Sequence, residues 1–96
     1  MKVISDISNT IEELLSAAEQ HIECAYKKKE EFPSVAQAYY ALSVSEMTNI
    51  MALHDQVVKL IDDYRKKQGD PPERMMGRYE YAHERMVERS NKIKVL

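Results

Sequence analysis

The sequence lacks tryptophan and holds one cysteine, two glycines and three prolines among its 96 residues. A single thiol, Cys24, cannot form a disulfide within the chain, so we expect a reducing compartment and a cytoplasmic protein. No apolar run approaches the roughly 20 residues of a membrane-spanning helix, and we expect no membrane contact. Glycine-rich phosphate loops and Cys/His zinc spacings are also absent from the sequence.

Neither sign of charge dominates the chain. Charged residues make up 31% and hydrophobic residues 44%, and the formal net charge is −2, which is typical of a globular protein. The basic run Lys27–Lys29 is followed at once by Glu30 and Glu31, so we expect no nucleic-acid partner. A chain of this length makes a single helical domain over 1–96 with a small core, which favours a homo-oligomer, a dimer or larger.

Helix-boundary signals predict three long helices, near 10–31, 34–68 and 71–95, and therefore an all-α fold. Gly69 follows a basic turn and ends the second helix. Each helix start is predicted from a capping box, which places Thr, Ser or Asp three residues before Glu or Gln: Thr10 with Glu13, Ser34 with Gln37, and Asp70 with Glu73. The short connections make successive helices antiparallel neighbours, with the middle helix as the spine of the bundle.

The middle helix carries two stripes of mostly apolar residues at three-four spacing. One stripe consists of Val35, Tyr39, Leu42, Glu46, Ile50, Leu53, Val57, Leu60 and Tyr64. The other consists of Tyr40, Val44, Met47, Met51, His54 and Val58. Two stripes indicate a helix that is covered on more than one side, and a homodimer that completes a larger bundle would cover both.

Glu46 lies in the middle of the first stripe, between Leu42 and Ile50. A buried carboxylate without a partner costs several kcal/mol or more, so it needs a hydrogen-bond donor, a proton or a metal. Three interpretations stay open at this point. Glu46 pairs with a tyrosine or histidine across the core, it ligates a metal, or the stripe is turned so that Glu46 reaches solvent.

Depth along the bundle indicates which residues can meet Glu46. The first turn lies near residue 33, so the level of Glu46 on the antiparallel first helix is near residue 20. Glu19 and His21 flank the apolar stripe of that helix at this level, while Glu23 points further outward. Carboxylates and imidazoles from facing helices are the usual ligands of metal sites in helical bundles.

The third helix carries a second polar group. Glu80 and His83 form an E-x-x-H pair that can present both side chains to one site. The same depth estimate puts His83 roughly 15 Å from Glu46 along the axis but close to the level of His54. Glu46 and the Glu80/His83 pair therefore join only between two chains, or they belong to two separate polar sites.

The stretch 38–54 resembles the second helix of the ferritin-like, rubrerythrin-type proteins. Those families place a Glu on one helix and an E-x-x-H on another. Glu46 matches the single glutamate, and Glu80 with His83 matches the E-x-x-H. Asn49 stands where the histidine of a second such motif would be, which is a departure from the family pattern.

The resemblance implies a ferritin-like bundle with a di-metal site for iron or manganese, in which Glu19 or Glu23 supplies the carboxylate of the first helix. It also implies a ferroxidase or peroxidase-like activity, which Asn49 and the three-helix length put in doubt. Two functions follow as alternatives. One is a small ferritin-like metal-binding protein, and the other is a non-enzymatic helical module for oligomerisation or protein interaction that binds no metal.

Overall fold

Three helices account for almost all of the chain in the computed structural model, which describes residues 2–95 apart from the side chains of residues 74, 75, 78, 79, 82 and 92–95. They are α1 (Lys2–Lys28), α2 (Pro33–Gln68) and α3 (Glu73–Val95). The described residues contain no strand, so the all-α class with three helices is confirmed. The helices differ in length and together form a rod of 56 × 18 × 17 Å.

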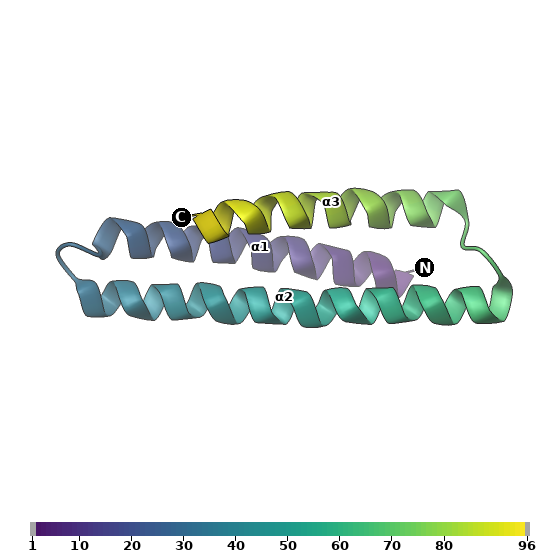
Figure 1. Cartoon of the computed structure of the whole chain (residues 1–96), viewed down its shortest axis with the longest axis horizontal. Helices are drawn as coiled ribbons and strands as arrows, with labels where there is room; N and C mark the ends of the chain where they lie inside the picture. Colours follow the sequence, from purple (N-terminus) through teal and green to yellow (C-terminus); the bar gives the residue numbers. More distant parts are fainter. Residues whose placement is uncertain (1, 96) are drawn as a thin grey trace.

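The chain reverses direction at each of its two short connections (Figure 1). Helix α2 runs back alongside α1, and α3 then returns in the direction of α1. Helix α1 packs against both other helices, most extensively against α2, whereas α2 and α3 touch at fewer places. The prediction that the middle helix is the spine is therefore wrong, and α1 has that role.

The first helix begins about eight residues earlier than the capping box predicted. The Thr10 hydroxyl donates to the Asp6 carbonyl, 3.0 Å away, so Thr10 lies inside the helix and caps nothing. The extra turns are held by the core, because Ile4 is buried and Ile7 packs against it. The helix also ends earlier than expected, at Lys28.

The predicted capping boxes of the other two helices do not form either. Helix α2 begins at Pro33, with Phe32 as its N-cap and no capping side chain, because proline at the first position already has the helical φ. Helix α3 begins at Glu73 rather than 71, and the Met76 N–H donates to the Pro72 carbonyl. The predicted end of α2 at Gly69 is confirmed, because Gly69 has φ 82° and its N–H donates to the Arg65 carbonyl.

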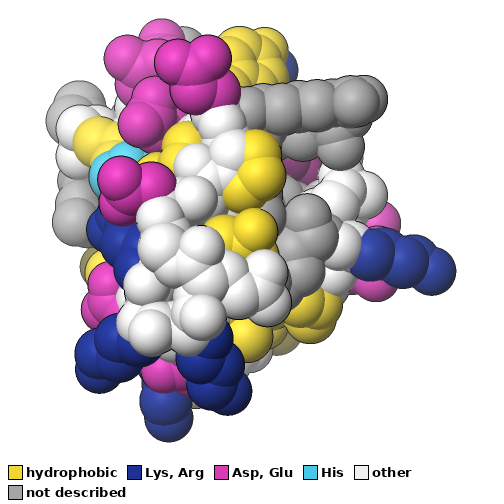
Figure 2. All heavy atoms as spheres, turned by 90° about the vertical axis from the view of Figure 1, so that its right-hand side faces the viewer, with side chains coloured by type: hydrophobic (Ala, Val, Ile, Leu, Met, Phe, Trp, Pro, Cys, Tyr) yellow, Lys and Arg dark blue, Asp and Glu magenta, His cyan; other side chains and the backbone are white. Residues whose placement is uncertain are grey.

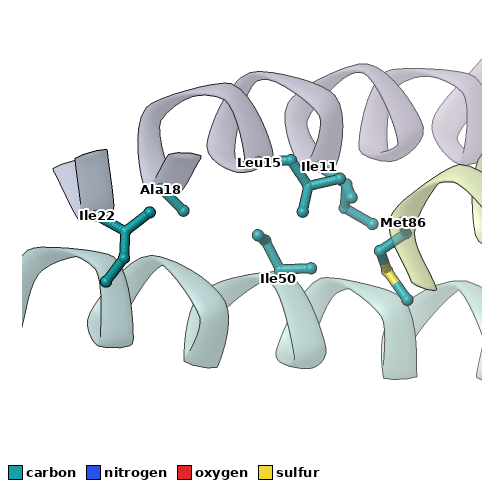
Figure 3. Packing of buried hydrophobic residues seen from close by; sticks show 6 residues of the cluster. All are labelled: Ile11, Leu15, Ala18, Ile22, Ile50 and Met86. Carbon is teal, nitrogen blue, oxygen red and sulfur yellow. The ribbon is translucent and has the colours of Figure 1, made fainter. Parts of the chain in front are cut away.

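A seven-residue repeat of buried side chains forms the contact between α1 and α2, which we call the α1–α2 seam. On α1 the repeat consists of Ile4, Ile11, Ala18 and Ala25. On α2 it consists of Ala36, Ser43, Ile50 and Val57. A strict repeat of seven keeps two helices in contact along their length through a gentle left-handed supercoil. Figure 3 shows Ile50 facing Ala18 and Leu15 across this seam.

This repeat turns α2 away from the orientation that the first stripe predicted. Val35 and Leu42, expected in the core, are 44% and 48% exposed. Ala36 and Ser43, which that stripe leaves out, are buried instead. Small side chains at these two positions let α2 approach α1 closely near the first turn, where α1 presents Ala25.

Helix α3 contributes less to the core. Met86 is buried against the cluster of Ile11, Leu15 and Ile50 (Figure 3). Met76 packs on a second cluster near the start of α1. The three-four spacing of Met75, Tyr79, Ala82, Met86 and Ile93 predicts an apolar face on this helix, but the side chains of all of these except Met86 lie outside the described residues. Over the described part of the chain, no helix has an apolar stretch long enough to cross a bilayer.

Replacing Ile50, which is fully buried in the seam, with alanine should lower the free energy of unfolding by about 2–5 kcal/mol, because the cavity lies between two helices. Val3→Ala is the matched control, since Val3 is exposed, and it should change the free energy by less than about 0.5 kcal/mol. Urea unfolding followed by circular dichroism measures both. Equal effects of the two substitutions would contradict this assignment of the core.

Candidate functional site

Glu46 on α2 meets His21 on α1. The Nδ1 atom of His21 lies 2.5 Å from the Oε1 atom of Glu46. The two side chains are 29% and 14% exposed, so the carboxylate is largely inside the bundle, as the stripe predicted. The ring of Tyr39 lies beside the imidazole, with 6.0 Å between ring centroids. Of the three interpretations left open for Glu46, the structure shows the pairing with a histidine of the facing helix.

The chemistry of the pair follows from its partners. An ionised carboxylate has no hydrogen to donate, so the Nδ1–H of His21 is the donor to Glu46 in that state. Hydrogen bonds to a charged group are worth roughly 1.5–3 kcal/mol, more than neutral ones. The pair therefore satisfies the buried carboxylate and ties α1 and α2 together at one level.

Glu19, the other carboxylate expected at this level, is held by α3 instead. The Nε atom of Arg89 lies 2.6 Å from the Oε1 atom of Glu19, and a terminal nitrogen of the same guanidinium donates to the Ser16 hydroxyl at 2.9 Å. This contact joins the interior of α1 to the second half of α3. Sequence reasoning missed it, although Arg85 and Arg89 are spaced four residues apart and face acidic residues of α1.

A second arginine contact lies one turn away on α3. Arg85 is 3.3 Å from Glu12 of α1 and donates to the Tyr81 hydroxyl. The hydrogen bond to Tyr81, together with the charge of Glu12, raises the pKa of the Arg85 guanidinium above its usual value. Glu23, also predicted as a ligand, pairs with Lys27 on the exposed side of α1 at 3.2 Å.

His54 and His83 meet at a separate place, between α2 and α3. Their ring centroids are 4.8 Å apart and the rings are inclined by 30°. His54 also lies near Asp55, with 3.8 Å between Nδ1 and Oδ1. Glu80, the other half of the E-x-x-H pair, is exposed. The depth estimate is confirmed for both histidines, which share a level well away from Glu46.

The seven predicted ligands are thus distributed over separate contacts. Glu46 and His21 form one pair, Glu19 and Glu23 form ion pairs elsewhere, and His54 lies with His83 between α2 and α3. Among the side chains that the structure describes, no three His, Cys, Asp or Glu residues are grouped so that they could hold a metal ion. One chain by itself does not bring the predicted di-metal set together.

The exposed side of the first half of α2 is the second candidate site. We call it the outer face of α2, and it comprises the exposed residues between positions 33 and 53. Its large apolar side chains are Val35, Tyr40, Leu42, Val44 and Met51. Tyr40 and Met51 are 53% and 50% exposed. Four members of the second predicted stripe are exposed in the single chain, namely Tyr40, Val44, Met51 and Val58, while its Met47 packs on the core.

Charge is absent from the outer face of α2 and concentrated elsewhere. Between positions 33 and 53 the only Asp, Glu, Lys or Arg is Glu46, which is turned toward His21. The end of α2 is different, because its last turn carries Arg65, Lys66 and Lys67. Figure 2 views the molecule from that end, where Lys and Arg side chains gather on the side of α2.

Comparison of the chain with protein-family models, with curated proteins and with solved structures finds no match. The resemblance to ferritin-like proteins therefore rests on the residues that carry it. Functional arguments for this chain come from the His21–Glu46 pair and from the outer face of α2.

Removing one member of the His21–Glu46 pair should destabilise the fold more than removing both. His21→Leu leaves a largely buried carboxylate without its donor, at a cost of about 1–3 kcal/mol. The double substitution His21→Leu/Glu46→Leu places two apolar residues together and should be close to neutral or stabilising. Urea unfolding of both single variants and of the double variant gives the coupling energy. Single-variant effects that add to within about 0.5 kcal/mol would show that the pair contributes nothing.

Proposed function

We propose that this chain is a non-enzymatic helical interaction module that binds another helix through the outer face of α2. One observation carries the proposal: five to six turns of an exposed helix bear no charged side chain pointing to solvent. Charged residues make up 31% of the chain, so this uncharged surface is a local feature and not a property of the composition.

The free energy available to such a contact comes from apolar burial. Tyr40, Val44 and Met51 lie along one flank of the outer face, and Leu42 and Val35 lie along the other. Burying apolar surface contributes about 25 cal/mol per Å². Monomeric proteins rarely expose contiguous apolar patches larger than a few hundred Å², and larger patches mark interaction sites. A second helix, which matches the length and curvature of α2, is the partner shape that fits a linear patch.

The His21–Glu46 pair supports this function indirectly. A glutamate on the outer face would have to lose its water when a partner helix bound, which is unfavourable without a compensating charge. Pairing with His21 turns the one carboxylate of this segment toward α1. The same contact holds α2 at a fixed rotation relative to α1, so the uncharged residues remain outward.

The proposal is tested by placing the photo-crosslinker p-benzoylphenylalanine at single positions in the living cell. Incorporated in place of Met51, on the outer face, it should give a covalent adduct with a helical segment, identified by mass spectrometry. In place of Gln20, which is exposed on α1, it should give none. Adducts at neither position, with the full-length protein expressed and folded, would overturn the proposal.

Metal binding is a second candidate function, favoured by the meeting of a largely buried carboxylate with an imidazole. A carboxylate that holds one nitrogen of a histidine and leaves the other to a metal is a common arrangement in metal sites. Glu46 and His21 fit that part of a site, and the ferritin-like resemblance suggests iron or manganese. The remaining ligands do not fit within one chain, so Glu19, Glu80 or His83 would have to come from a second chain or a rearranged bundle.

Elemental analysis tests the metal candidate. Protein expressed with added iron and manganese should carry near-stoichiometric metal that disappears in Glu46→Gln and persists in the control Glu13→Gln, whose side chain is exposed on α1. Size-exclusion chromatography with light scattering gives the mass of each variant alongside. Wild-type protein free of metal would remove this candidate and leave the interaction module unaffected.

A further inference from the structure

We infer that the partner of the outer face of α2 is a second copy of this chain, which pairs antiparallel with the first about a two-fold axis near Ser45. This inference rests on the proposed interaction function and specifies its partner. In such a dimer the two α2 helices lie against each other on the side opposite α1, so both α1–α2 seams stay intact.

The absence of charge on the outer face selects the kind of surface that covers it. A charged partner surface would lose its hydration there without meeting an opposite charge. The same uncharged face of a second copy carries no such penalty. A two-fold contact is self-complementary, because it brings each flank of the face against the same flank of the other copy. The flank that carries Tyr40, Val44 and Met51 then lies on the same side of the contact in both copies.

The middle of the outer face carries small side chains, which allow another helix to approach closely. Five exposed residues with small or short side chains follow one another at alternating spacings of three and four: Ala38, Ala41, Ser45, Thr48 and Ala52. This spacing places them in one line along α2, opposite the buried repeat. Small side chains at a helix contact allow an interaxial distance near the lower end of the usual range of about 8–10 Å.

The line of small residues is nearly symmetric about Ser45. Ala38 and Ala52 lie seven residues to either side of it. When two copies of α2 run antiparallel with their Ser45 residues facing, Ala38 of each copy lies level with Ala52 of the other. Small residues therefore meet small residues along the whole contact.

Charge at the end of α2 favours the antiparallel over the parallel arrangement. A parallel pair would place two copies of the basic turn at Arg65, Lys66 and Lys67 side by side, where they repel. In the antiparallel pair these two turns are about 60 Å apart, at about 1.5 Å per residue from the axis near Ser45. Opposed helix dipoles also favour the antiparallel pair.

The size of the contact sets the expected strength of the dimer. The outer face is about 30 Å long and about 10 Å wide, the width of one helix. A strip of this size covers about 300 Å², which is below the roughly 600 Å² or more that specific interfaces bury on each partner. We therefore expect a weak dimer that forms and dissociates with protein concentration.

Disulfide trapping tests the arrangement. In a Cys24→Ser background, Ser45→Cys should form an intermolecular disulfide under mild oxidation, because each copy of position 45 faces the other. Ala38→Cys alone should not, but a mixture of Ala38→Cys with Ala52→Cys should give the mixed dimer on a non-reducing gel. Homodimers of Ala38→Cys together with homodimers of Ala52→Cys would show parallel pairing and overturn the inference, as would the absence of any Ser45→Cys dimer.

Sedimentation measures the same contact without oxidation. Ala41→Glu puts a charge in the middle of the outer face and should weaken dimerisation at least tenfold, with helicity unchanged by circular dichroism. Gln20→Glu makes the same charge change on exposed α1 and should leave it unchanged. A wild-type monomer at all concentrations that still gives Met51 adducts with another protein would refute self-pairing and retain the interaction module. A monomer that gives no adducts would refute both.

Discussion

The seven-residue repeat of the α1–α2 seam is the constraint on which the rest of this structure depends. It keeps two long helices in contact from Ile4 to Ala25 of the first, and the largest buried side chains, such as Leu15 and Ile50, are part of the same packing. Helix α3 adds Met86 to a core that α1 and α2 have already formed. Its polar contacts, through Arg85 and Arg89, also go to α1. Without the seam, α3 would have no surface on which to pack.

The His21–Glu46 pair fixes the register and the rotation of α2 relative to α1 along that seam. Hydrophobic contacts tolerate small rotations of one helix against another, whereas a hydrogen bond at 2.5 Å between a largely buried carboxylate and an imidazole does not. The pair also determines which side chains the opposite side of α2 exposes. With Glu46 turned toward α1, the segment from 33 to 53 shows solvent only uncharged side chains. The inward pair and the outward apolar face are thus two results of one rotation of the same helix.

Part of the candidate site was predictable because antiparallel helices joined by a short turn have a nearly fixed register. Counting residues from the turn placed Glu46 level with His21, and His83 near the level of His54, and both pairs are present. The contact of Arg89 with Glu19 was missed, because it depends on which helix α3 packs against. Counting residues from a turn gives the position of a residue along the bundle axis, but it does not show which other helix its own helix packs against.

The sequence by itself determined that the chain is helical and that Gly69 ends the second helix, since few breakers and a three-four apolar spacing allow little else. It favoured an inward Glu46, but only the structure decided between the three interpretations of that residue. It did not determine the helix starts, because Thr10 and Asp70 can cap a helix but the packing of Ile4 and the prolines decided otherwise. Tertiary structure alone decided that Ala36 and Ser43 are buried while Val35 and Leu42 are exposed. The physical reason is close packing. A helix with two apolar faces buries the face that packs most closely against its neighbour, and here that face carries the smaller side chains.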